Sequence, residues 1–471
     1  MCKFQARVRR TMVANLSVLV LAGGKGTRMK SATPKPLHTI FGLPLLGHIL
    51  QTADTLKPSA NVILCGHQAD ILKKTVQDNY AAWGIKAPAK FALQKVLNGS
   101  GSAVKAAMPA LKNYKQVLIL AGDAPLIEAD TLKQLVKHHN AKKAACTVLT
   151  VEVPNPKGYG RIVKENNFVR IVEESETDAK TAPIKEVNSG MYIFEIAELA
   201  KVLKLLKPQG PKQEYYLTDT LALLQQKGKK VEIFKAADYK EAMGINSKKQ
   251  LAEAAQAMRE KINNKLMDAG VILIDPQSTY IDKTVKIGAD TVIYPNCYIY
   301  GKTVIGENCK IGPNCWIENS KFENNVEVKM SCYILDSHLK EGAQTEPFAK
   351  LRPQTVVENK AKIGSFVEIK KSVIGKGSKV PHLSYIGDTL MGAGVNIGAG
   401  AITCNYDGEH KHQTIIGDDV FVGSNTNFVA PVKVGAGAKI GAGSTITEDI
   451  PAKTLAIARA RQVNLKNKKG K

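Results

Sequence analysis

Apolar side chains recur at every sixth residue through much of the second half of the sequence. Neither the 3.6-residue period of a helix nor the two-residue period of a strand generates such a series. A period of six is typical of hexapeptide β-solenoids, in which each short strand contributes one side chain to the core and glycine or asparagine forms the corners. The positions are Ile281, Ile287, Ile293, Ile299, Ile305, Ile311 and Ile317, followed by Ile416, Val422, Phe428, Val434, Ile440 and Ile446.

The six-residue period breaks in two places. One break lies near residues 318–345 and the other near 405–415. Breaks of this kind mark insertions or loops in a repeat protein. We therefore expect the solenoid to be interrupted at both places.

Residues 16–246 follow a different pattern, in which short apolar runs alternate with helical segments. Residues 17–21, 61–65, 116–120 and 146–151 are continuous apolar runs. Buried parallel strands that are covered by helices on both faces have this appearance. The pattern predicts a mostly parallel sheet between two layers of helices.

The two patterns predict two folded domains joined by a helix. Apolar residues at helical spacing over residues 247–268, with charges on the other face, predict that helix, and Gly270 ends it. The expected organisation is a basic extension over 1–15, an α/β domain over 16–246, the linker over 247–270, the solenoid over 271–458 and a basic tail over 459–471.

The N-terminus and the cysteines favour a reducing, cytoplasmic environment. The apolar run at residues 16–22 leads directly into a glycine loop, which suits a strand better than a signal peptide. No apolar run approaches the roughly 18 residues of a transmembrane helix. The eight cysteines include no CxxC pair. We expect Cys297, Cys309 and Cys315 to be small, half-buried, reduced thiols. The alternative is a zinc site formed by these three residues.

The net charge is strongly positive, with 66 Lys and Arg against 42 Asp and Glu, or +24. Such an excess is found in proteins that bind nucleic acid or anionic membranes. However, residues 1–11 and 459–471 together hold ten of these charges. Phosphate-rich small substrates account for the remainder, so we expect no nucleic-acid partner.

A glycine-rich loop follows the first predicted strand. It reads Leu21-Ala-Gly-Gly-Lys-Gly-Thr-Arg-Met29 and leads to Pro34-Lys-Pro36. Glycines let backbone N–H groups approach phosphate oxygens, and Arg28 and Lys35 can neutralise phosphate charge. The loop matches neither the dinucleotide fingerprint nor the P-loop, so taken alone it is equally consistent with a structural turn. Asp123 follows a later strand, where α/β sheets place ligands, and its carboxylate suits Mg²⁺.

The loop with its trailing lysine resembles the signature of sugar-1-phosphate nucleotidyltransferases. Together with residues 155–161, Glu173, 186–190 and 214–219, it resembles the uridyltransferase half of the bacterial bifunctional enzymes that make UDP-N-acetylglucosamine. The resemblance implies a Rossmann-like domain that acts on UTP, with Lys35 and Arg28 in catalysis and Mg²⁺ held by Asp123 and Asn246. It implies that nucleotide and sugar contact Leu21, Ala22, Gly23, Gly24, Lys35, Gln94, Gly99, Ser100, Ala121, Gly122, Asp123, Gly160, Glu173, Asn188 and Asn246.

The solenoid region carries polar residues that a scaffold does not require. His382 lies in the sequence among Arg352, Lys370, Tyr385 and Lys411, which can bind an anionic group. A neutral histidine can accept a proton from an amine near neutral pH. A single histidine in a β-protein is nevertheless more often a packed or surface residue.

From about residue 352 to residue 459 the sequence is similar to the acetyltransferase half of the same enzymes. This similarity implies a left-handed parallel β-helix that forms a homotrimer with acetyl-CoA between subunits, and His382 as general base. Glucosamine-1-phosphate would contact Arg352, Lys370, Tyr385, Asn396 and Lys411. Acetyl-CoA would contact Ala399, Asn405, Tyr406, Ser424, Ala442 and Arg459.

The favoured interpretation is a bifunctional enzyme. It would acetylate glucosamine-1-phosphate with acetyl-CoA and then transfer uridylyl from UTP to N-acetylglucosamine-1-phosphate, releasing pyrophosphate and a precursor for peptidoglycan and lipopolysaccharide. One alternative is a monofunctional sugar-1-phosphate nucleotidyltransferase whose solenoid is structural or regulatory. Another is a nucleic-acid or membrane-surface binder.

Overall fold

The computed structural model describes residues 15–165, 168–209 and 213–465. The chain forms two compact units, Met1–Met258 and Arg259–Lys471. Their boundary falls inside α7 (Lys248–Asp268), which is the helix expected as a linker. Nearly all of the expected basic extension and the last six residues of the expected tail lie outside the described residues. Within the described ranges, every helix is too short or too polar to cross a lipid bilayer.

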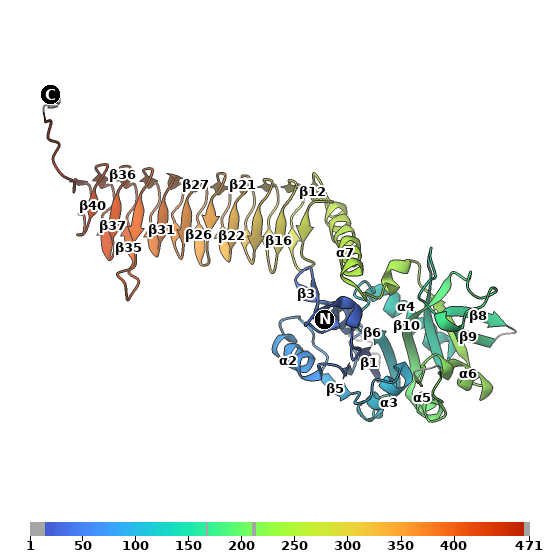
Figure 1. The fold of residues 1–471 in the computed structure, drawn as a ribbon. Coiled ribbons are helices and arrows are strands. Elements are labelled where there is room, and N and C mark those ends of the chain that lie inside the picture. The colour runs from blue at the N-terminus through green and yellow to red at the C-terminus, as the bar shows by residue number, and fades with distance from the viewer. Residues whose placement is uncertain (1–14, 166–167, 210–212, 466–471) are drawn as a thin grey trace, which may run out of the picture. The chain divides into compact units, whose positions relative to one another are not determined.

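A nine-stranded sheet forms the centre of the first unit (Figure 1). Its strands are β1 (Leu16–Leu21), β4 (Ala60–Cys65), β5 (Ala89–Leu93), β6 (Gln116–Ala121), β7 (Cys146–Glu152), β8 (Arg161–Glu165), β9 (Phe168–Val172), β10 (Glu186–Glu195) and β11 (Val231–Lys235). The main path has the order β11-β7-β10-β6-β1-β4-β5. These strands are parallel except β10, which is antiparallel to both of its neighbours. A small pair, β2 (Thr39–Ile40) and β3 (Leu43–Pro44), lies apart from this sheet.

Helices cover both faces of the sheet. They are α1 (Leu45–Asp54), α2 (Ala69–Asn79), α3 (Ser100–Leu111), α4 (Ala129–Lys142), α5 (Ile196–Leu203) and α6 (Asp219–Gln226). Val18 and Val20 of β1 pack into one apolar core with α1, α2 and α4, whereas Leu19 packs into the other core with α3, α5 and α6. Burial of both faces explains the continuous apolar runs. The four predicted strands and the mostly parallel sheet are confirmed.

The carboxyl ends of β1 and β6 lie next to each other, because Leu21 pairs with Ala121. β4 lies on the opposite side of β1, so the order of the strands along the chain reverses at this point. Such a switch point leaves a crevice beyond the strand ends, where α/β proteins bind ligands. The glycine-rich loop and the loop that contains Asp123 both begin here.

Three parallel sheets wind around one apolar core in the second unit (Figure 1). The first sheet contains β12 (Ile272–Leu273), β15 (Val292–Ile293), β18 (Lys310–Ile311), β21 (Glu327–Val328), β24 (Gln344–Thr345), β27 (Lys362–Ser365), β30 (Lys379–His382), β33 (Asn396–Ile397), β36 (Phe421–Val422), β39 (Lys439–Ile440) and β41 (Leu455–Ala456). The second contains β13 (Tyr280–Ile281), β16 (Tyr298–Tyr300), β19 (Trp316–Glu318), β22 (Tyr333–Leu335), β25 (Lys350–Leu351), β28 (Glu368–Lys370), β31 (Tyr385–Gly387), β34 (Ile402–Cys404), β37 (Asn427–Val429) and β40 (Thr445–Ile446). The third contains β14 (Lys286–Ile287), β17 (Val304–Ile305), β20 (Lys321–Phe322), β23 (Ser337–Leu339), β26 (Thr355–Val357), β29 (Val373–Ile374), β32 (Thr389–Met391), β35 (Thr414–Ile416) and β38 (Val432–Val434).

The six-residue series forms the core of this solenoid. Every position of both series is buried except Ile287, which is half-buried. Each coil places one of these side chains inside from each of its three sheets, and burial of that apolar surface is the main stabilising contribution. The predicted hexapeptide solenoid is confirmed.

The expected interruption over residues 318–345 is wrong. β20 to β24 continue the three sheets through this region. The apolar period breaks because the coil shortens by one residue: Val304 pairs with Lys321, 17 residues on, whereas Val292 pairs with Lys310, 18 residues on. The loop expected near 405–415 is confirmed, since no strand lies between β34 and β35 and only an isolated bridge joins Tyr406 to Lys411.

The C-terminal half of α7 packs against the first coils of the solenoid. Asn263 Nδ2 donates hydrogen bonds to the carbonyl oxygens of Pro276 (2.8 Å) and Thr279 (3.0 Å). The Arg259 guanidinium lies 4.9 Å from the centre of the Tyr280 ring. The helix therefore caps an end of the core that would otherwise meet water, as repeat proteins require.

The described cysteines are all free thiols, and only Cys404 is exposed. Cys297, Cys309 and Cys315 are fully buried rather than half-buried. Their thiols donate to the backbone carbonyls of Gly312, Glu323 and Lys329, at 3.1, 3.2 and 3.1 Å. In the described part of the chain no three His, Cys, Asp or Glu side chains are grouped to hold a metal, so the structure does not support the zinc alternative.

Candidate functional site

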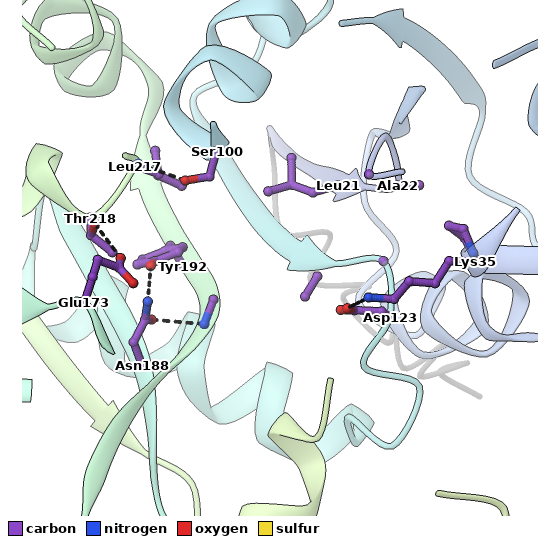
Figure 2. Close-up of a pocket in the computed structure, with 15 residues that line it drawn as sticks. Leu21, Ala22, Lys35, Ser100, Asp123, Glu173, Asn188, Tyr192, Leu217 and Thr218 are labelled. Atoms are coloured by element: carbon purple, nitrogen blue, oxygen red, sulfur yellow. Dashed lines mark hydrogen bonds and ion pairs between the residues drawn. The ribbon is translucent and has the colours of Figure 1, made fainter. Parts of the chain in front are cut away.

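A cavity of about 290 Å³ lies where β1 and β6 end, and Figure 2 shows the side chains around it. Ten of the residues expected to bind nucleotide and sugar line it: Leu21, Ala22, Gly24, Lys35, Ser100, Ala121, Gly122, Asp123, Glu173 and Asn188. The remaining lining residues are Pro36, Gly190, Tyr192, Leu217 and Thr218. The fold thus gathers around one cavity the motifs that are scattered along the sequence.

Lys35 is the cationic centre of this cavity. Its ammonium forms an ion pair with Asp123 Oδ2 and lies 2.6 Å from Asn246 Oδ1. Lys35 begins the short helix η2 (Lys35–Leu37), Asp123 follows β6, and Asn246 lies two residues before α7. Two side-chain oxygen atoms from distant segments therefore face one cation.

Two glycines allow the loops to approach each other closely. The Gly122 N–H donates to the carbonyl of Leu21 at 3.0 Å, and a Cβ on Gly122 would lie only 2.5 Å from that oxygen. A Cβ on Gly23 would lie 3.2 Å from the backbone nitrogen of Gly66. The glycine-rich loop is therefore a packed element of the fold as well as a potential phosphate cradle.

The start of α3 forms another wall of the cavity. Ser100 Oγ accepts a hydrogen bond from the Leu217 N–H at 3.0 Å. Gly99 has a φ of +108°, and a Cβ there would lie 2.4 Å from the Tyr215 carbonyl oxygen. Gln94 donates to Ser102 Oγ (2.7 Å) and to the Gly99 carbonyl (3.2 Å), so it supports this loop from behind.

Glu173 lies beside this wall, because Thr218, the residue after Leu217, holds its carboxyl group. Thr218 Oγ1 donates to its Oε1 at 3.1 Å. Burial raises the pKa of Glu173, and the hydrogen bond from Thr218 opposes that shift only in part. Gly160 lies beside this carboxyl group, because a Cβ there would be 3.6 Å from Glu173 Oε2.

Six expected residues are not part of the cavity lining. Gly160 and Asn246 contact residues that line it, and Gly23 lies within the glycine-rich loop. Gln94 is bonded to Gly99, which directly precedes the lining residue Ser100. Arg28 is exposed on the short helix η1 (Thr27–Met29). Sequence reasoning missed Tyr192, which belongs to none of the motifs. Leu217 and Thr218 lie in the segment 214–219, which had no residue-level assignment.

A group of cations lies at one corner of the solenoid. The neighbouring Lys411 ammonium lowers the pKa of Lys370. Arg352 Nη1 lies 2.8 Å from Glu368 Oε1, and these two residues come from adjacent coils. Glu368 neutralises Arg352, whereas Lys370 and Lys411 repel each other, so an anion such as a phosphate group would stabilise that pair of lysines.

Tyr385 and Asn405 adjoin this corner. A Cβ on Gly387 would lie 2.5 Å from the Tyr385 hydroxyl and 2.9 Å from Asn405 Nδ2, so both groups lie over that glycine. Asn405 Nδ2 donates to Asp388 Oδ2 at 2.5 Å. The structure therefore places expected sugar-binding and expected acetyl-CoA-binding residues side by side.

His382 stands in a column of corner residues. Lys379, Asn396, Phe421 and Lys439 pair with one another along the first solenoid sheet. His382, Ala399, Ser424 and Ala442 each lie three residues after one of these positions and are therefore stacked. The Arg459 Nη1 extends the column by donating to the Ala442 carbonyl at 2.7 Å.

The loop after β34 presents Tyr406 and Lys411 at its two ends. The Asp407 carboxylate accepts from the N–H groups of His410 (2.7 Å) and Glu409 (2.8 Å) and lies 2.6 Å from His412 Nε2. The His410 N–H, followed by His412, holds the pKa of Asp407 well below its usual range. These contacts of the Asp407 carboxylate stabilise the conformation of the loop.

Both units match known protein families. A model described as nucleotidyl transferase matches residues 17–261, and one described as bacterial transferase hexapeptide (six repeats) matches residues 284–319 and 413–448. The chain is thus of the class in which a nucleotidyltransferase domain precedes a left-handed β-helix transferase domain.

Relatives that span nearly the whole chain define the family more closely. The protein named bifunctional protein GlmU from Heliobacterium modesticaldum is 46% identical and covers 94% of this chain and 96% of its own length. The GlmU proteins of Geotalea uraniireducens and Carboxydothermus hydrogenoformans are 46% and 45% identical, over 96% and 95% of this chain and 98% of each of their own. The chain belongs to the GlmU family of bifunctional transferases. The predicted family, fold classes and pair of uridylyltransferase and acetyltransferase activities are confirmed.

Proposed function

We propose that UTP reacts with N-acetylglucosamine-1-phosphate in the cavity of the first unit, and that glucosamine-1-phosphate accepts an acetyl group at the cationic corner of the solenoid. The convergence of Lys35, Asp123 and Asn246 at the switch point carries the first assignment. The product of acetyl transfer is the substrate of uridylyl transfer.

Uridylyl transfer needs charge neutralisation and positioning rather than a protein nucleophile. A phosphate oxygen of the sugar phosphate attacks the α-phosphorus of UTP in line, and pyrophosphate leaves. Lys35 and Arg28 neutralise the phosphates, and the N–H groups of the glycine-rich loop hold them. Ser100, with Gln94 and Gly99 beside it, receives the nucleotide, and Glu173 and Asn188, with Gly160 beside them, receive the sugar.

Asp123 and Asn246 fit a divalent cation. Both oxygen atoms already contact one positive group, the Lys35 ammonium, and hard oxygen ligands are those that Mg²⁺ prefers. Oxygen atoms of the substrate phosphates would supply further ligands of the kind that Mg²⁺ prefers. Bound there, Mg²⁺ would neutralise phosphate charge, and Lys35 would then be available to contact the substrate phosphates.

Two features of the solenoid support the assignment of acetyl transfer to it: the group of cations at one corner and the column of corner residues that contains His382. Arg352, Lys370 and Lys411 hold the sugar phosphate, with Tyr385 and Asn396 beside the sugar. His382 accepts the proton as the amine attacks the thioester carbonyl of acetyl-CoA, and the coenzyme A thiolate leaves. Acetyl-CoA runs along the column of corner residues, against Ala399, Ser424, Ala442 and Arg459, with Asn405 and Tyr406 at its acetyl end.

We further propose that the chain works in the cytoplasm as a homotrimer assembled through the solenoid. Most soluble oligomers are homo-oligomers with closed symmetry, and a flat solenoid flank can pair with copies of itself. The free thiols of the described cysteines suit a reducing compartment.

Two assays on the purified chain test these proposals. Thiol release from acetyl-CoA should require glucosamine-1-phosphate, and pyrophosphate release from UTP should require N-acetylglucosamine-1-phosphate and Mg²⁺. Thiol release no faster than the enzyme-free control would leave only a nucleotidyltransferase with a structural solenoid. Sedimentation of a monomer at assay concentrations would contradict the trimer.

A further inference from the structure

The side chains of Asn188 and Tyr192 are hydrogen-bonded although they lie four residues apart on one strand. A regular strand rises about 3.3 Å per residue, which would separate these positions by about 13 Å. Instead, Asn188 Nδ2 donates to the Tyr192 hydroxyl at 2.7 Å. The register explains this contact. Asn188 pairs with Thr150 and Tyr192 pairs with Val148. An advance of four residues along β10 therefore matches an advance of only two along β7, which is a β-bulge.

This bulge is held by hydrogen bonds of its own. Gly190 adopts a φ of +75°, which side chains other than glycine rarely tolerate. The buried Ser189 hydroxyl donates to the Leu149 carbonyl at 2.7 Å and accepts from the Met191 N–H at 3.1 Å. These bonds satisfy backbone groups that the bulge removes from the ladder. Bulges beside active sites re-aim side chains.

The bulge fixes both ends of the Asn188 amide. The Gly190 N–H donates to Asn188 Oδ1 at 3.0 Å, and the buried Tyr192 hydroxyl receives the amide N–H, as Figure 2 shows. An amide group has two N–H donors and an oxygen with two lone pairs. One N–H and one oxygen lone pair of the Asn188 amide are therefore left for a ligand, and their orientation on the cavity wall is fixed.

We infer that Tyr192 is a positioning residue that orients Asn188 for the sugar phosphate. This inference rests on the proposed function of the cavity. An amide that is ordered before the substrate binds loses less conformational freedom on binding, and it presents its donor and acceptor in one arrangement. Tyr192 thus acts on recognition of the sugar phosphate rather than on UTP.

Tyr192→Phe removes only the oxygen that receives the Asn188 amide. We expect the KM for N-acetylglucosamine-1-phosphate to rise about 10-fold, as the loss of one net hydrogen bond implies, with the KM for UTP and kcat within about twofold. Tyr80→Phe is the matched control, because Tyr80 also accepts from an asparagine, Asn61, at 2.9 Å, but lies outside the cavity lining. Tyr80→Phe should lower stability and leave both KM values unchanged.

A double substitution tests whether Tyr192 acts through Asn188. Tyr192→Phe should have no further effect on KM in an Asn188→Ala background. Additive effects, or an unchanged KM in the single Tyr192→Phe variant, would overturn the inference. If the wild type makes no UDP-N-acetylglucosamine at all, the proposed function of the cavity fails instead. If Tyr192→Phe does not melt cooperatively, Gly190→Ala strains the same bulge and carries the same expected KM change.

Discussion

Lys35 Nζ lies 2.6 Å from Asn246 Oδ1, although 211 residues separate the two in the sequence. The same ammonium pairs with Asp123, which follows β6. Three segments of the first unit therefore meet at one charge, at the point where the strand order reverses. This arrangement makes Asp123 the most direct target for separating the two activities.

Asp123→Ala should disable uridylyl transfer and spare acetyl transfer. The change removes an oxygen ligand of the proposed Mg²⁺ site and the partner of Lys35, so we expect kcat for UDP-N-acetylglucosamine formation to fall at least about 100-fold. Acetyl-CoA-dependent thiol release should stay near the wild-type rate. Loss of both activities, in a protein with the circular dichroism of the wild type, would contradict independent sites.

His382→Ala should have the reverse effect. Loss of the general base should slow acetyl transfer by about 100- to 10,000-fold, while uridylylation of ready-made N-acetylglucosamine-1-phosphate stays near normal. His338→Ala is the control, since His338 also lies on the solenoid but pairs with Glu323 at 2.9 Å. An equal loss of thiol release in both variants would point to a general disturbance of the solenoid.

Most of the architecture could be predicted from the sequence because buried positions produce a regular pattern of apolar residues. The apolar runs of the parallel sheet and the six-residue series of the solenoid each reflect one repeated geometry. The break over residues 318–345 was misjudged for a physical reason. The loss of one corner residue, as between Val304 and Lys321, shifts an apolar period just as an insertion does.

The site was less predictable where contacts depend on irregular backbone. Tyr192 lies in an apolar strand segment, and strand periodicity places it about 13 Å from Asn188. Only the bulge at Gly190 brings the two side chains together. Leu217 reaches the cavity in the same indirect way, through the bond of its N–H to Ser100. Spacing along the chain carries no signal for such contacts.

The two glycines Gly122 and Gly24 should respond differently to alanine. A Cβ at Gly122 would lie 2.5 Å from the Leu21 carbonyl oxygen, whereas a Cβ at Gly24 would have no atom within 4 Å. We expect Gly122→Ala to destabilise the first unit by about 1–3 kcal/mol and Gly24→Ala to leave its stability unchanged. Denaturant unfolding in a Trp316→Phe background measures this, because Trp83 then reports the first unit alone. Equal destabilisation by both changes would contradict the close approach of the loops.

The buried His139 should make the first unit less stable in acid. His139 Nδ1 bonds to Thr147 Oγ1 at 2.9 Å, and its Nε2 lies 3.5 Å from Glu195. Burial lowers the pKa of His139, and Glu195 opposes the shift while the neighbouring His138 adds to it. Since the unfolded chain binds this proton more readily than the folded chain, the stability of the first unit should fall as the pH drops below about 6.5.

Substitution of His139 tests the origin of that acid sensitivity. His139→Gln removes the titrating group, so the free energy of unfolding should change less between pH 7.5 and pH 5 than in the parent Trp316→Phe protein. His138→Gln is the matched control, because His138 is partly exposed and faces Glu232 at 3.3 Å. It should retain most of the pH dependence. An identical pH profile for His139→Gln and the parent would assign the acid sensitivity to other groups, because glutamine does not titrate in this pH range.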